Sequence, residues 1–377
     1  MTNLTIKFIS MRRLIYLSML FFPLVSIAQN EGKAQLSTVL SCDATSVKSQ
    51  GRTGTCWSFS TTSFLESEHL RKTGEVLDLS EIYTVRKIYV EKGEKYLRYH
   101  GTCNFSQGSL GHDVIHSYKK YGMMPESVYD GMNGDTMHNH SKLVPDLKQY
   151  LDSILANTPI SPTWKIGYNA ILDKHLGILP DMFEYDGKMY NARSFARNVV
   201  GLDDEEYVGF TSFTHQDPHE EVIVEVPDNF SNGRYFNLSL DEMMTVMEHA
   251  LSKGFTIEWD GDVSEQGFST RSGFAVFTSD TAALKRLPEL PAEDDANAEK
   301  RQELFDDLTT TDDHLMHITG ISRAEDGTKF FITKNSWGTR AGIDGFMHMS
   351  ENYVKMKTIC IIVNKNAVPL HILDLMK

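Results

Sequence analysis

A cysteine at the expected start of a helix is the residue best suited to nucleophilic chemistry in this sequence. Cys56 follows a loop that holds Gln50 and two glycines, and residues 56–73 favour a helix. At that position the helix dipole and the free N–H groups favour thiolate over thiol, and they can donate to an oxyanion formed when sulfur attacks a carbonyl. The side-chain amide of Gln50 can reach the same oxygen from the loop. A buried structural cysteine is the alternative, but the glycines, Gln50 and Trp57 argue against it, and we predict that Cys56 is a nucleophile.

A thiolate nucleophile needs a base and a group that orients the base. Residues 315–322 and 329–334 are strand-like, and Glu-Asp-Gly at 325–327 is a turn signal between them. An antiparallel hairpin around this turn brings together its two open ends, which hold His314 and Asn335. An asparagine carbonyl that accepts from one imidazole nitrogen would aim the other nitrogen at the nucleophile. We therefore predict His314 as the base and Asn335 as the residue that orients it.

His317 is the other candidate for the base. It lies three residues after His314, so strand alternation places the two side chains on opposite faces and only one can face the cleft. The hairpin symmetry favours His314. Trp337 follows Asn335 by two positions, and we expect it to pack over the His–Asn pair and shield it from water. A plain core tryptophan is the alternative.

The elements that must position these residues divide into a helical and a strand-rich half. Helices are predicted at 56–73, before the stop signal Gly74, after the N-cap Ser80, and at 112–121. Strands are predicted at 222–226, 255–259, 273–277, 317–321, 329–333 and 359–363. A helical half followed by a strand half predicts an α+β protein with two lobes and an active site in the cleft between them.

Two stretches read as additions to this plan. Residues 130–217 mix Gly, Asn, His, Pro and aromatic residues without a sustained period, which predicts a large insertion. Residues 287–313 carry two prolines and a dense acidic run, which predicts an exposed loop with a short helix at 299–305.

The first 28 residues are typical of an export signal. Basic residues precede a nearly continuous apolar run at 14–27, and Ser-Ile-Ala at 26–28 predicts cleavage before Gln29. A membrane anchor is the alternative, but the run is shorter than the roughly 20 apolar residues that usually cross a bilayer. We expect a signal peptide at 1–28, a mature domain at 29–377, and export to the periplasm or the medium.

Charge and cysteine count exclude several classes of protein. The chain carries a net charge of −14, and removal of three basic and no acidic residues with the signal gives −14 − 3 = −17. Such a chain should bind neither nucleic acid nor anionic lipid. Besides Cys56 there are only Cys42, Cys103 and Cys360, so at most one internal disulfide can form beside a working thiol. No metal-ligand spacing or nucleotide fingerprint is present, and we expect no metal and no cofactor.

The motifs resemble those of papain-like cysteine peptidases. The resemblance rests on residues 50–60, on Asp313 with His314, and on Asn-Ser-Trp-Gly at 335–338, and the three occur in the family's order. Residues 121–125, 226–229, 234–238 and 261–263 are similar to the bleomycin hydrolase and aminopeptidase C branch. The gap from Cys56 to His314, 314 − 56 = 258 residues, exceeds the roughly 130–150 of simple papain-like enzymes and fits the enlarged branch.

This resemblance implies a papain-like fold and a cysteine peptidase that acts through Cys56, His314, Asn335 and Gln50. It also implies that a glycine-rich segment binds the substrate backbone, through Gly108 or Gly111. Thr53 stands where the family has a cysteine, so the family disulfide is absent.

The resemblance further implies peptide substrates, assembly into homo-oligomeric rings, and removal of N-terminal residues enforced by a C-terminal arm. The chain ends at Lys377 and its tail is shorter than that arm. The resemblance favours an aminopeptidase acting on oligopeptides, and the short tail keeps other functions open. An endopeptidase, a dipeptidase and a non-catalytic peptide-binding protein are the alternatives.

Overall fold

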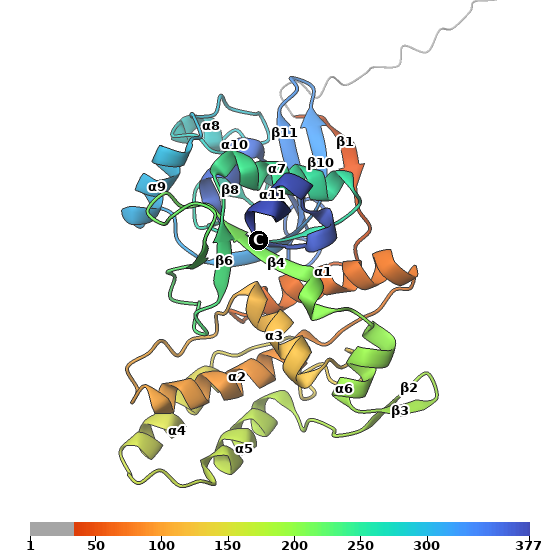
Figure 1. The fold of residues 1–377 in the computed structure, drawn as a ribbon, viewed down its shortest axis with the longest axis vertical. Coiled ribbons are helices and arrows are strands. Elements are labelled where there is room, and N and C mark those ends of the chain that lie inside the picture. The colour runs from red at the N-terminus through yellow and green to blue at the C-terminus, as the bar shows by residue number, and fades with distance from the viewer. Residues whose placement is uncertain (1–33) are drawn as a thin grey trace, which may run out of the picture. The chain divides into compact units, whose positions relative to one another are not determined.

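The computed structural model describes residues 34–377, so the predicted signal peptide lies outside the described residues. In this part of the chain the helices between residues 56 and 195 lie together on one side of a large sheet, whereas the later helices lie around the sheet itself (Figure 1). None of the helices between residues 34 and 377 has both the length and the apolar character needed to cross a bilayer.

Three helices build the first lobe as the sequence predicts. They are α1 (Cys56–Thr73), α2 (Glu81–Arg98) and α3 (Gly111–Tyr121). Gly74 ends α1 with a left-handed backbone, φ 79°, and the Ser80 side chain caps α2 by accepting from the Tyr83 N–H. Helix α1 is buried along most of its length because it packs against α2 and α3 on one side and the sheet on the other.

Residues 130–217, which the sequence predicts to be a large insertion, contain regular elements that sequence analysis did not identify. This stretch forms α4 (Leu143–Leu155), α5 (Trp164–Leu176), the hairpin β2 (Phe183–Tyr185) and β3 (Lys188–Tyr190), α6 (Ala192–Phe195) with a π-helical turn after it, and β4 (Tyr207–Thr211). Leu143, Leu147 and Leu151 are buried at four-residue spacing, and α4 packs against α2 and α5. Each helix has only 13 residues, so loops between them obscure the period. Strand β4 joins the main sheet.

The main sheet has eleven strands. Ten of them are hydrogen-bonded in the order β5-β6-β4-β13-β7-β10-β11-β12-β9-β8, and the eleventh, β1, pairs with β10. The bounds of its other strands are β1 (Leu36–Ser41), β5 (Glu221–Ile223), β6 (Arg234–Asn237), β7 (Ile257–Gly261), β8 (Phe268–Ser269), β9 (Phe274–Ala275), β10 (His314–Ala324), β11 (Lys329–Lys334), β12 (Phe346–Ser350) and β13 (Thr358–Asn364). All six predicted strands overlap strands of this sheet. Strands β1, β4, β6, β8 and β12 were not predicted, and β8 is only a short pairing with β9.

The central strands are buried on both faces. Leu315 and Cys360 belong to the core shared with α1, whereas Trp259 and Met316 belong to a second core with α7 (Leu240–Ser252). Neighbouring residues of one strand thus enter different cores, as the two-residue period requires. Short helices complete the lobe: α8 (Thr281–Leu284), α9 (Ala298–Asp306), α10 (Glu351–Lys357) and α11 (Leu370–Leu375). Helix α9 confirms the predicted short helix at 299–305.

Candidate active site

The loop before Cys56 is held in place by backbone contacts. Gly51 has φ +63°, and a Cβ there would lie 2.4 Å from the His138 carbonyl oxygen, so this position requires glycine. The next residue, Arg52, donates its N–H to the same carbonyl at 2.8 Å. Gly54 donates its N–H to the Gln107 side chain at 2.7 Å. These bonds fix the point at which the chain turns into α1.

Cys56 is the first residue of α1, and no side chain caps this end of the helix. The backbone N–H groups of Trp57 and Leu315 point to its sulfur. Leu315 follows His314 directly, so the thiol lies against the start of β10. Burial raises the pKa of Cys56 to about 12, and the two N–H groups act in the opposite direction by stabilising the thiolate.

The two ends of the predicted hairpin meet. Strands β10 and β11 pair antiparallel with His317 opposite Lys334, and His314 Nε2 donates to Asn335 Oδ1 at 2.9 Å. Within residues 34–377, no hydrogen bond involves His314 Nδ1, which leaves that nitrogen available for proton transfer. Burial lowers the pKa of His314 to about 4, while the bond to Asn335 raises it. The imidazole is therefore neutral at pH 7 and able to accept a proton.

Trp337 lies where the sequence predicts. Its ring stacks on the His314 ring with centroids 4.4 Å apart and planes inclined by 28°. The side chain remains 37 % exposed, so its outer face is open to a ligand. Asn335 Oδ1 also accepts from the Ser336 N–H at 2.7 Å, which fixes the amide that faces His314.

Gln50 joins the Cys56 loop to the end of β11. Its backbone N–H donates to the Ser336 carbonyl at 2.8 Å, and its Oε1 accepts from the Ser336 hydroxyl at 2.6 Å. Its Nε2 donates to the Thr53 carbonyl at 2.7 Å. A primary amide carries two hydrogens, so one remains to donate to a substrate oxygen. The residues predicted to form the site, Gln50, Cys56, His314, Asn335 and Trp337, thus lie in one region.

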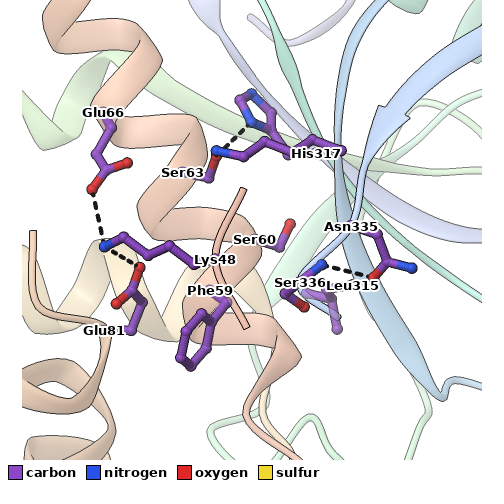
Figure 2. A pocket seen from close by; sticks show the side chains of 11 residues that line it. Lys48, Phe59, Ser60, Ser63, Glu66, Glu81, Leu315, His317, Asn335 and Ser336 are labelled. Carbon is purple, nitrogen blue, oxygen red and sulfur yellow. Dashed lines mark hydrogen bonds and ion pairs between the residues drawn. The ribbon is translucent and has the colours of Figure 1, made fainter. Parts of the chain in front are cut away.

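His317, the other candidate for the base, has a different environment. Its Nδ1 is 2.9 Å from the Ser63 hydroxyl of α1, and Lys334 donates to the same hydroxyl at 2.7 Å. Figure 2 shows His317 and Ser63 in a buried pocket between the two lobes, with Lys48, Glu66 and Glu81. We call this the interlobe pocket; its volume of ≈ 20 Å³ suffices for one water molecule. His317 has no bond to Asn335, so only His314 forms the predicted pair.

The two glycines predicted to bind substrate differ in accessibility. Gly108 is half-buried, and its carbonyl accepts from the Lys92 ammonium. Gly111 is buried at the start of α3, where a Cβ would lie 2.7 Å from the carboxyl carbon of Glu258. The geometry therefore leaves Gly108 the more accessible of the two, and both roles stay predictions.

All four cysteines are free thiols, which answers the question that the sequence left open about Cys42, Cys103 and Cys360. Cys42 lies 3.6 Å from the Phe255 carbonyl oxygen. Cys360 lies 3.4 Å from the Asp260 carboxylate. Among the described residues no cluster of three or more His, Cys, Asp or Glu side chains has the arrangement of a metal site.

Sequence analysis missed a group of buried carboxyls beside Cys56. Glu258 and Asp260 of β7 and Asp312, two residues before His314, are close enough to influence one another, and Asp260 and Asp312 share a hydrogen bond. Asp260 and Asp312 also act on the Cys56 thiol. The position of Asp312 in the acidic run before His314 was a signal that could have drawn attention to it. We call these three residues the β7 carboxyl cluster.

A papain-like fold with a cysteine beside a His–Asn pair defines a class, the cysteine peptidases, and comparison with known proteins agrees. The model of the Peptidase C1-like family matches residues 181–377, more than half of the chain, and that of the papain family cysteine proteases matches residues 37–86. The chain belongs to the Peptidase C1-like family and is a cysteine-type peptidase.

Individual relatives are distant but cover most of the chain. It is 22% identical over 366 residues to aminopeptidase C of Lactococcus lactis subsp. lactis (strain IL1403), which spans 85% of this chain and 80% of that protein. Aminopeptidase C of Streptococcus thermophilus is also 22% identical, over 390 residues, 91% of this chain and 86% of the relative. The crystal structure of PepW from Lactobacillus rhamnosis HN001 superposes with a TM-score of 0.71 at 18% identity, covering 90% of this chain and 84% of that one. The latter likeness establishes the fold.

Proposed function

We propose that the protein hydrolyses peptide bonds through Cys56, His314 and Asn335 and acts as an aminopeptidase on oligopeptides. The observation that carries the proposal is the position of the Cys56 thiol, which lies against the Leu315 N–H directly beside the bonded pair of His314 and Asn335. The names of the curated relatives support the aminopeptidase part.

The proposed reaction has two halves, formation of an acyl-enzyme on Cys56 and its hydrolysis by water. His314 Nδ1 takes the proton of Cys56 as the sulfur attacks the substrate carbonyl, and the oxyanion receives the remaining amide hydrogen of Gln50 and an N–H at the start of α1. His314 then gives the proton to the leaving amine. Water, deprotonated by the same nitrogen, releases the acyl group and restores the thiol. Asn335 keeps Nε2 occupied so that Nδ1 faces the reaction.

The test is digestion of a defined decapeptide by the purified protein, with the products identified by mass spectrometry. Successive loss of single N-terminal residues is expected, and Cys56→Ala should abolish it. Cys42→Ala provides the matched control, because Cys42 is a free thiol that contacts the Phe255 carbonyl and lies outside the proposed triad. Cleavage by Cys56→Ala at the wild-type rate would contradict the proposed chemistry. Internal cleavage with the N-terminal residue retained would instead assign an endopeptidase.

We also propose that the protein is exported and loses residues 1–28. The support is the basic start, the apolar run and the small residues before Gln29. N-terminal sequencing of the protein recovered from its native host should begin at Gln29. A first residue upstream of the apolar run would overturn this proposal.

A further inference from the structure

The three carboxyls of the β7 carboxyl cluster lie together without a cationic side chain bonded to them in the described part of the protein. Glu258 and Asp260 are fully buried, and no side-chain cation forms an ion pair with Glu258, Asp260 or Asp312 among residues 34–377. Both oxygens of Glu258 are buried without a hydrogen-bonding side chain, and the side-chain partners of Asp260 and Asp312 are only each other and, for Asp260, the Cys360 thiol. Buried carboxylates normally have such partners, because an unpaired charge is costly away from water.

The groups that surround the cluster do not supply the missing cation. Lys92 of α2 acts on Asp312, but its ammonium donates to the carbonyls of Ser106 and Gly108 instead of to a carboxylate. The other titratable groups that face the cluster are neutral or acidic: Asp228, Asp313, Tyr235, Cys56 and Cys360. A ligand with a positive charge would therefore complete the site.

The cluster has a defined place relative to the proposed nucleophile. Asp260 is the register partner of Leu315, the residue whose N–H points to the Cys56 sulfur. In the sheet, β7 lies on one side of β10 and β11 lies on the other. The cluster and the Asn335–Trp337 segment therefore flank His314 on opposite sides. A peptide bound across Cys56 would have one of its two ends directed toward the cluster.

The cluster also reaches the surface. Asp312 and Asp228 are half-buried, as is Gly108, which faces Asp228 so closely that a Cβ would overlap its carboxylate. Glu258 and Asp260 lie beneath them. Asp312 is therefore the member of the cluster that lies nearest to solvent.

We propose that the β7 carboxyl cluster receives a positively charged amino group of the peptide substrate. The inference rests on the proposed peptidase function and adds a specificity determinant to it. The charged group has two chemical sources, the α-amino terminus and a basic side chain, and both would form charge-assisted hydrogen bonds with the unpaired oxygens. Asp312 is the member closest to the surface, so it makes the first contact.

Burial gives this proposal a distinctive signature. It raises the pKa of Asp312 to about 7 and that of Glu258 to about 8, and it raises the pKa of Asp260 well above its usual range. At pH 6 Asp312 and Glu258 are therefore mainly protonated. A bound cation stabilises the carboxylate form, so its arrival displaces a proton to the buffer.

The binding test uses the inactive Cys56→Ala protein and isothermal titration calorimetry at pH 6, in two buffers of different ionisation enthalpy. Leucinamide is compared with N-acetyl-leucinamide, and N-acetyl-lysinamide with N-acetyl-norleucinamide. We expect the charged member of one pair to bind more tightly, by about 10- to 100-fold, with release of about one proton. The first pair identifies the α-amino group as the ligand, and the second identifies a basic side chain.

Asp312→Asn, added to Cys56→Ala, should remove both the tighter binding of the charged compound and the release of a proton on binding. Asp313→Asn is the matched control, because its carboxyl is adjacent and also has a raised pKa, of about 7, yet it bonds to the Val263 N–H. Equal binding of charged and acetylated compounds, or a preference that survives Asp312→Asn in a folded protein, would overturn the inference. If amines bind as expected but the active protein cleaves no peptide, the proposed function fails and the cation site stands.

Discussion

Two buried polar groups lie on either side of β10, and they are built in opposite ways. In the interlobe pocket, on the β11 side, Lys48 Nζ lies 2.8 Å from Glu81 and 3.6 Å from Glu66, and Lys334 donates to Ser63 at 2.7 Å. On the β7 side, three carboxyls lie together without an ion-paired cation among the described residues. The first group has its charges balanced by the chain itself, whereas the second does not.

The difference indicates different uses. The balanced pocket joins the loop before α1, the helices α1 and α2, and strand β11, which also bears Lys334 next to Asn335. Through Ser63, which bonds to His317 and Lys334, it ties α1 to β10 and β11. The unbalanced cluster gives the fold no comparable bond, and its unpaired oxygens are better explained by a ligand. The two groups should respond to neutralising mutations in opposite directions.

Lys48→Met should have the largest effect, on stability. It leaves Glu66 and Glu81 buried without their cation, and breaking a buried pair in this way costs about 3–5 kcal/mol. Since the Lys48 side chain is 20% exposed, we expect the lower end of that range. Chemical denaturation followed by fluorescence measures the loss. Lys165→Met breaks the more exposed pair with Glu94 and should cost less than about 1 kcal/mol. Equal losses in both variants would show that the interlobe pocket does not hold the lobes.

Asn335→Ala should lower kcat/KM by about 10²-fold, the lower end of what general acid–base catalysis contributes. His314 stays in place but loses the acceptor that fixes its orientation, a bond of 2.9 Å. The rate of Cys56 alkylation by iodoacetamide, measured against pH, should change its profile as well. Asn366→Ala, at an exposed position, is the control. An unchanged alkylation profile combined with full activity would remove Asn335 from the proposed mechanism.

The residues that sequence analysis predicted to meet are those that local rules bring together. His314 and Asn335 are 21 residues apart in one hairpin, so strand period and a turn signal suffice to pair them. Cys56 was placed by a helix whose start and stop signals are explicit in the sequence, from the glycine loop to Gly74. Both inferences need only short segments of chain.

The β7 carboxyl cluster could not be predicted in this way. Glu258 and Asp260 alternate with apolar residues in β7, a pattern that ordinarily marks a solvent-facing side. They are buried because β7 lies between β13 and β10 and because α3 begins at Gly111, directly over Glu258. These neighbours come from segments more than 50 residues away in the chain, and no local sequence pattern predicts that they pack against β7. Helices α4 and α5 were missed for a simpler reason, since each spans fewer than four turns.

Glu258→Gln should act on stability in the direction opposite to Lys48→Met. The folded protein holds a proton on Glu258 up to about pH 8, whereas an unfolded glutamate loses it near pH 4. The stability that this proton contributes is complete below about pH 4 and is lost as pH rises through about 8. The amide needs no proton, so the variant should gain a few degrees of Tm over wild type between pH 5 and 8. Parallel Tm curves for the two proteins would contradict this, and exposed Glu299→Gln should give such parallel curves.

The smallest expected effect is a pH dependence of substrate preference in the wild-type enzyme. The ratio of kcat/KM for leucyl-aminomethylcoumarin to that for its N-acetyl derivative isolates the amino group, because the chemistry at Cys56 and His314 is common to both and cancels. The Asp312 carboxyl, with a pKa of about 7, ionises as pH rises from 5.5 to 7.5, and an α-amino group loses its charge near pH 8. The ratio should therefore rise a few-fold to a maximum near pH 7 and then fall. In Asp312→Asn the rising limb should disappear while the falling limb, which belongs to the substrate, remains. A ratio that is flat across this range would mean that the carboxyls beside Cys56 do not bind the amino group. The lack of a paired cation in the β7 carboxyl cluster would then have a cause other than substrate binding.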